Sequence, residues 1–180
     1  MSIHRRLLGW LGAKDGMTHI VPGKIAPGFS LKSVDAREFS LGSALQKGPV
    51  VVAFFKVSCP VCRFTFPFLE RLFRQYGGKE ATFLGVSQDG ASASRDFARE
   101  SGITFPILVD STGYPVSNAY GLTSVPTFFL INPDGTVQVS CMGFGKAEIE
   151  TIADALADRG NITRSPVFRV DEAVPAYKPG

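Results

Sequence analysis

The chain has 180 residues, of which 44% are hydrophobic and 19% charged, a balance typical of a soluble globular domain. Its net charge of +3 is too small to indicate nucleic-acid binding, and no basic run is interleaved with aromatic residues. Three cysteines are too few for a disulfide-stapled scaffold. No apolar stretch reaches the length of about 18 residues that a membrane-spanning helix needs. We therefore expect one domain with its own hydrophobic core and short extensions.

Residues 1–24 form an N-terminal arm that ends in Val21-Pro22-Gly23. Basic residues at positions 4–6 precede an apolar run at 7–13, which is a weak likeness of an export signal. That run is short, and no convincing cleavage site follows it. A short helix or ordered arm is the favoured interpretation, with a surface anchor or an export signal as alternatives. We expect the protein to be cytoplasmic.

Residues 25–160 form the expected central domain, because apolar runs and turn signals alternate along them. Residues 50–55 are apolar throughout, as a strand buried on both faces must be. The helix predicted from about Cys59 to Tyr76 carries an apolar stripe, with Glu70 among the charged residues outside it. The predicted elements are a hairpin at 29–39, a strand at 50–55, a helix at 59–76, a strand at 82–86, a helix at 91–101, a strand at 104–109, a short helix ending at 121, strands at 127–131 and 136–141, and a helix ending at 160.

Strands that alternate with helices and then close on a hairpin predict an α/β fold with a mixed central β-sheet and helices on both faces. The turn of the closing hairpin is Asn132-Pro133-Asp134-Gly135. Residues 161–180 contain three prolines and no periodicity. We expect them to form an extended C-terminal tail over the surface.

The sequence Cys59-Pro60-Val61-Cys62 lies where the buried strand gives way to the helix. Pro60 suits the first helical position, where a backbone N–H would have no partner. The free N–H groups and the positive end of the helix dipole then favour a thiolate at Cys59. Cys62, one turn further in, is expected to be more buried and to resolve a mixed disulfide by attacking Cys59. This pair closes too small a loop to act as a structural staple, so its plausible uses are redox exchange or half of a metal site.

Several motifs in chain order resemble those of one superfamily. The strand–Cys-x-x-Cys–helix unit, with Pro67 five residues after Cys62, resembles the active-site helix of thioredoxins. Ser124-Val125-Pro126-Thr127 resembles the cis-proline loop that lies against the active-site disulfide and pairs with the substrate backbone. Residues 25–158 are thus similar to the thioredoxin-like superfamily. The motifs at 26–31, 85–89, 105–110 and 132–135 resemble the redoxin branch of this superfamily. That branch includes TlpA/ResA-type reductases and AhpC/TSA-type peroxiredoxins.

The resemblance implies a thioredoxin fold and a thiol–disulfide oxidoreductase that acts on protein disulfides or dithiols. It also implies an upstream dithiol reductant, such as a thioredoxin reductase. We expect a monomer without cofactor, metal, nucleic acid or membrane span. The implied site residues are the catalytic pair Cys59 and Cys62 and the substrate-binding residues Pro60, Val61, Val125 and Pro126.

Three positions depart from the pattern of these relatives. Ala53 stands where many thioredoxins carry a buried acid, and Thr65 stands where TlpA/ResA-type proteins often carry a glutamate. Ser58 precedes the first cysteine, where a tryptophan is common. The proton acceptor for Cys62 is therefore unassigned. Lys56 is interpreted either as a solvated loop charge or as a group that favours the Cys59 thiolate.

Two alternative functions stay open. A peroxiredoxin would use Cys62 as its peroxidatic cysteine, but Phe55 and Cys59 replace the proline and threonine of its Pro-x-x-x-Thr-x-x-Cys motif. A non-catalytic thioredoxin-like binding module commonly lacks one or both cysteines, and this chain keeps both.

A zinc site is a further alternative for the cysteine pair. A structural zinc ion needs four ligands. Only Cys141, His4 and His19 remain as candidates, and they form no second ligand pair. Cys141 itself is interpreted as a buried or half-buried strand cysteine, with an accessory redox thiol as the alternative.

Overall fold

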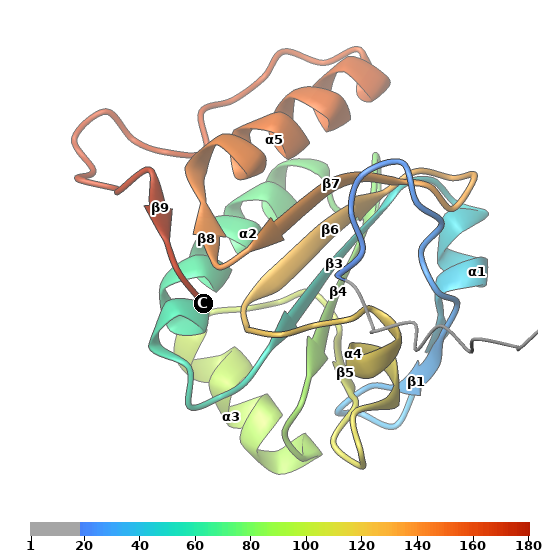
Figure 1. The fold of residues 1–180 in the computed structure, drawn as a ribbon. Coiled ribbons are helices and arrows are strands. Elements are labelled where there is room, and N and C mark those ends of the chain that lie inside the picture. Colours follow the sequence, from blue (N-terminus) through green and yellow to red (C-terminus); the bar gives the residue numbers. More distant parts are fainter. Residues whose placement is uncertain (1–18) are drawn as a thin grey trace, which may run out of the picture.

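The computed structural model describes residues 19–180 and contains a five-stranded central sheet of strand order β5-β4-β3-β6-β7 (Figure 1). The strands β3, β4 and β5 run parallel, whereas β6 is antiparallel to both β3 and β7. The sheet is therefore mixed, as the alternation of elements predicted. The strands span Val50–Phe55 (β3), Thr82–Ser87 (β4), Ile107–Val109 (β5), Thr127–Ile131 (β6) and Val137–Met142 (β7).

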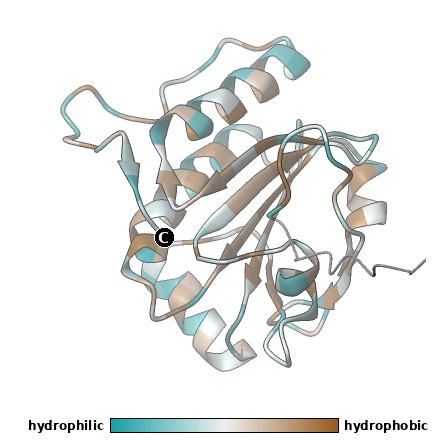
Figure 2. Ribbon diagram, viewed as in Figure 1, coloured by the Kyte–Doolittle hydropathy of each residue, from teal (hydrophilic) through white to brown (hydrophobic). Residues whose placement is uncertain are grey.

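Helices cover both faces of this sheet. Because successive side chains of a strand point to opposite faces, the six buried residues of β3 divide between two cores. Val51, Ala53 and Phe55 pack with the larger helices, and Val50, Val52 and Phe54 pack on the other face. The first core is covered by α2 (Pro60–Tyr76), α3 (Ala91–Ser101) and α5 (Lys146–Gly160), and the second by α1 (Leu41–Leu45) and α4 (Pro115–Ala119). Figure 2 shows the hydrophobic colour concentrated on the central strands.

Two small antiparallel pairs flank the central sheet. The pair β1 (Ser30–Lys32) and β2 (Glu38–Ser40) is the hairpin that the sequence predicts. The pair β8 (Phe144–Gly145) and β9 (Tyr177–Lys178) was not predicted. It joins the C-terminal tail to the segment that follows β7, so part of the extended tail expected at 161–180 pairs as a strand.

Three further details correct the sequence prediction. The helix α1 was missed, although Ser40 caps it by accepting the Ser43 N–H at 3.2 Å. The strand expected at 104–109 begins only at Ile107, because the Thr104 N–H is donated to Glu70 and Pro106 has no N–H to donate. Glu70, expected on the outer face of its helix, is 5% exposed because its carboxylate also accepts the Thr104 hydroxyl.

The predictions for residues 1–24 fall mostly outside the described residues, which begin at His19. From Gly23 onward the chain is tied to the core, since the Gly23 N–H donates to the Val137 carbonyl at 2.8 Å. Within residues 19–180, no helix has both the length and the apolar character needed to cross a membrane.

Candidate active site

The turn from β3 into α2 holds Cys59 at the N-cap of the helix. Cys59 has an extended backbone conformation (φ −82°, ψ 115°), and Pro60 follows at the start of the helix. The Cys59 Sγ accepts the backbone N–H of Cys62 at 3.1 Å. A sulfur that receives a backbone N–H at a helix N-terminus lies where negative charge is stabilised. This local geometry follows from the proline, whose missing N–H and fixed φ favour helix initiation.

Cys62 lies in a different environment, although it is only three positions further along. Its side chain has 0% exposed surface, and it packs within the core between the sheet and α2. Burial raises the pKa of the Cys62 thiol well above its ordinary value, and the interaction with the Cys59 side chain raises it further. Cys62 is therefore protonated at neutral pH. Both cysteines are free thiols here.

The loop before β6 closes the site from the other side. The Val125–Pro126 peptide bond is cis. The Cys59 thiol donates to the Val125 carbonyl oxygen at 3.3 Å, across 66 positions of sequence. Val125 is half-buried and Pro126 is buried, whereas Pro60 is exposed and Val61 half-buried. The structure thus brings Val125 directly against Cys59, and it leaves the turn at Pro60 accessible.

A cleft of about 320 Å³ adjoins this loop. Val125 and Ser124 form one wall, while Lys56 and Tyr114 line the side nearer β3 and α4. The Lys56 Nζ lies 5.6 Å from the centre of the Tyr114 ring, so this ammonium group makes a cation–π contact. The two interpretations of Lys56 from the sequence, a solvated loop charge and a group that favours the Cys59 thiolate, stay predictions.

Asp89 is a site residue that the sequence reasoning missed. Its Oδ2 accepts the Val57 N–H at 2.8 Å and so ties the loop before Cys59 to the end of β4. The negative charge of Asp89 is also one of the smaller causes that raise the pKa of Cys62. Asp89 falls in the 85–89 run that carried the family resemblance, but a contact between two loops leaves no local pattern that would assign it a role.

The two missing carboxylates are not replaced at their own positions. Ala53 is buried within β3, paired with Gly85 on one side and Phe128 on the other. The Thr65 hydroxyl donates to the Val61 carbonyl at 2.7 Å, one turn back along α2. Neither residue offers a proton acceptor to Cys62.

Cys141 lies in the same core cluster as Cys62 but on β7, and His19 precedes the central sheet in the chain. Cys141 is buried on β7 opposite Phe128, and burial raises the pKa of its thiol to about 12. His19 Nε2 lies 2.7 Å from the Ser140 hydroxyl oxygen. Within residues 19–180, no three His, Cys, Asp or Glu side chains gather in a way that could hold a metal ion. His4 lies outside the described residues.

Comparison with known proteins agrees with this geometry. The model of the AhpC/TSA family matches residues 22–140. The thioredoxin-like protein YneN of Bacillus subtilis (strain 168) is 34% identical over 140 residues, which cover 75% of this chain and 80% of YneN. The thiol-disulfide oxidoreductase ResA of the same organism is 29% identical over 123 residues, 68% of each chain.

Among solved structures, a thiol:disulfide interchange protein of the thioredoxin family from Chlorobium tepidum TLS superposes with a TM-score of 0.63 at 26% identity, covering 77% of this chain and 99% of that one. The structural similarity and the family match over residues 22–140 lead to one assignment. The chain has the thioredoxin fold and belongs to the AhpC/TSA family, with relatives of the ResA type.

Proposed function

We propose that this protein is a thiol–disulfide oxidoreductase that exchanges electrons with protein disulfides through Cys59 and Cys62. The observation that carries the proposal is the position of Cys59, which caps α2, receives the Cys62 N–H and faces Val125. The names of ResA and of the Chlorobium protein support the same reaction class.

The reaction has two displacements. The Cys59 thiolate attacks one sulfur of a substrate disulfide, the substrate S–S bond breaks, and the departing thiolate takes up a proton. The product is a mixed disulfide between Cys59 and the substrate. Cys62 then loses its proton and attacks the Cys59 sulfur, which releases the second substrate thiol. Two electrons pass to the substrate, and the enzyme retains a Cys59–Cys62 disulfide.

The second displacement depends on removing a proton from a buried thiol. Because burial raises the pKa of Cys62, the resolving thiolate forms only when that proton is accepted by a base. The negative charge of Asp89, which is held by the Val57 N–H, raises the pKa of Cys62 and so opposes formation of this thiolate. Water or the departing substrate thiolate completes the transfer when no protein base is in contact.

Four residues are proposed to bind the substrate chain. Pro60 and Val61 form the surface of the turn, while Val125 and Pro126 form the opposing loop. The Val125 carbonyl, already an acceptor for Cys59, lies where a polypeptide disulfide must approach. The neighbouring cleft beside Lys56 offers room for a substrate side chain.

The direct test is reduction of insulin in dithiothreitol, followed by the turbidity of the released B chain. The proposal expects the protein to shorten the lag and to raise the rate in proportion to its concentration. No acceleration, with both thiols shown to be free by titration, would rule out the proposed reaction with protein disulfides. The reduction potential of the pair, measured in glutathione buffers, then decides between net reduction and net oxidation of substrates.

The working context is also part of the proposal. A dithiol reductant such as a thioredoxin reductase system would return the Cys59–Cys62 disulfide to the dithiol. We propose a monomer in the cytoplasm. Light scattering tests the monomer, and fractionation of cells that produce the tagged chain tests the location.

A peroxidase is the second candidate, because the chain matches the AhpC/TSA family and its motifs also resemble those of peroxiredoxins. It would need peroxide to reach Cys62, and the 0% exposure of Cys62 opposes this. Stoichiometric consumption of hydrogen peroxide by a Cys59→Ser protein would favour the peroxidase over the proposed reaction.

A further inference from the structure

The C-terminal tail returns toward the active site after it leaves α5. Its middle part is held firmly on α2, because Val167 and Phe168 are buried against the core. Arg71 donates to the Val167 carbonyl and pairs through both terminal nitrogens with the carboxylate of Glu172. The tail therefore has an anchor that is independent of its last residues.

Beyond this anchor the tail lies along the edge of the active-site region. Strand β9 pairs antiparallel with β8, with Lys178 opposite Phe144 and Tyr177 opposite Gly145. The Lys146 N–H adds a bond to the Ala176 carbonyl at 2.9 Å. Just before β8, the Gly143 N–H donates to the Pro126 carbonyl at 2.6 Å. The segment 143–145 therefore contacts the cis-proline loop at its first residue and pairs with the tail through β8.

Gly180 and Cys59 both lie against the Val125 carbonyl group. A side-chain carbon added to Gly180 would lie only 2.7 Å from the Val125 oxygen, which shows how closely the two backbones approach. Cys59 donates to that same oxygen at 3.3 Å. Figure 1 shows the end of the chain, marked C, beside the first turns of α2 and the start of β6.

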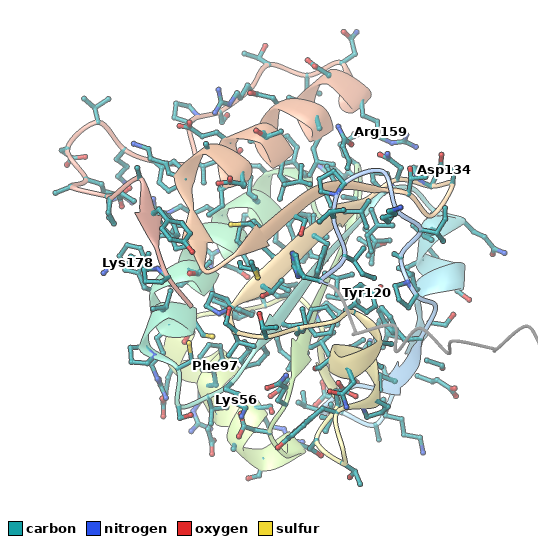
Figure 3. All side chains as sticks on the ribbon, viewed as in Figure 1. Lys56, Phe97, Tyr120, Asp134, Arg159 and Lys178 are labelled. Carbon is teal, nitrogen blue, oxygen red and sulfur yellow. The ribbon has the colours of Figure 1, made fainter. Side chains whose placement is uncertain are left out.

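Lys178 covers the neighbouring surface of α2. Its Nζ lies 4.9 Å from the centre of the Phe64 ring, and Phe64 follows Cys59 by five positions. In Figure 3, Lys178 projects from β9 beside this helix. Residues 177–180 thus contact the loop at Val125 and the helix surface at Phe64, which both adjoin Cys59, while the cleft beside Lys56 stays open.

The attachment of these four residues is weak compared with the anchor. The pairing involves only two residues of each strand, and Tyr177 is 56% exposed. Isolated two-stranded pairs are marginally stable in water, and segments with few buried contacts open at low free-energy cost. The segment 177–180 can therefore leave the site while Val167, Phe168 and Glu172 stay in place.

We propose that residues 177–180 are a self-docked strap that occupies the groove for protein substrates, and that an extended substrate segment must displace it to reach Cys59. The inference rests on the proposed function and deepens it, because it names the substrate class that the groove selects. An incoming strand would pair with Phe144–Gly145 and approach Val125 in place of β9. Small disulfides need no such pairing, so the strap discriminates against folded or bulky substrates.

The first test compares the full chain with a variant that ends at Ala176, using labelling of Cys59 as the readout. The fully reduced proteins are treated with iodoacetamide or with a maleimide that carries a polyethylene glycol chain, and Cys59 is quantified by peptide mapping. Because accessibility scales with the open fraction, removal of the strap should raise the rate with the large reagent about fivefold or more. The rate with iodoacetamide should stay within about twofold. Equal rates for both proteins with the large reagent would overturn the strap.

A second pair of variants keeps the chain length. Lys178→Glu removes the cation over Phe64 and should increase large-reagent labelling in the same direction as the truncation. Lys79→Glu makes the same change of charge on an exposed residue after the far end of α2, and should have no effect. Thermal unfolding of each variant verifies that the fold is retained. If Lys178→Glu and Lys79→Glu label alike, Lys178 does not hold a strap.

Turnover gives the substrate class. The truncated protein should reduce insulin with a lower KM than the full chain, whereas reduction of hydroxyethyl disulfide should be unchanged. A lower rate with insulin after truncation would contradict the strap and make residues 177–180 part of the docking surface. If neither protein reduces any disulfide, the proposed function fails, and the labelling rates still decide whether the segment covers Cys59.

Discussion

Cys59 and Cys62 are the same residue type on one helical turn, yet their surroundings divide the chemistry between them. Cys59 is partly exposed, receives a backbone N–H and faces Val125 across an open turn. Cys62 is wholly enclosed by the core, and its thiol has a raised pKa. Position on the helix thus produces one thiol suited to attack the substrate and one suited to resolve the mixed disulfide. The distinction comes chiefly from the burial of Cys62 and from the position of Cys59 at the helix N-terminus.

The largest expected effect is the loss of turnover when the exposed member of the pair is removed. Cys59→Ser should reduce insulin reduction to the uncatalysed level, because a hydroxyl at the N-cap still receives the Cys62 N–H but does not exchange disulfides. Cys141→Ser is the matched control, since Cys141 is a buried cysteine on β7 and should leave turnover unchanged. Insulin turnover at equal protein concentration measures both. Retained activity in Cys59→Ser would break the division of roles.

The next effect is the difference in labelling rate between the two thiols. Each unit of pKa changes the thiolate fraction tenfold, so Cys59 should react with iodoacetamide at neutral pH more than about 100-fold faster than the enclosed Cys62. Peptide mapping after short exposures gives both rates in one experiment. Earlier labelling of Cys62 would exchange the two assignments.

The pH dependence of resolution should follow the buried thiol. Because burial raises the pKa of Cys62, its thiolate fraction grows about tenfold per pH unit across the neutral range. A thionitrobenzoate adduct on Cys59 should therefore release its chromophore faster as the pH rises from 6 to 9, without a plateau. Stopped-flow absorbance measures this rate. A plateau near pH 7 would mean that Cys62 ionises in its ordinary range, contrary to its burial.

The smallest effect concerns Asp89. Asp89→Asn keeps an oxygen that can accept the Val57 N–H but removes a negative charge that raises the pKa of Cys62. Release of thionitrobenzoate should become about twofold to fivefold faster at pH 7. Asp96→Asn is the matched control, because Asp96 is a half-exposed partner of Arg99 on α3. Slower release in Asp89→Asn would instead assign Asp89 the part of proton acceptor.

Local patterns predicted the elements that build the site. The apolar run of β3, Pro60 at the helix start and the Gly102 stop after α3 each act within a few residues, and the structure places these elements where expected. The short strand β9 carries no such signal, because its partner β8 is more than 30 positions away. Glu70 and Asp89 were missed for the same reason, since each is defined by a hydrogen bond to a distant backbone N–H.

The central claim is that Cys59 attacks and Cys62 resolves, and trapping tests it most directly. Cys62→Ser lacks the resolving thiol, so it should accumulate a mixed disulfide with a protein substrate, which mass spectrometry should map to Cys59. Cys59→Ser should accumulate none, because the two remaining thiols, Cys62 and Cys141, are both buried. An adduct on Cys62 in the Cys59→Ser protein, with none on Cys59 in its counterpart, would contradict the account.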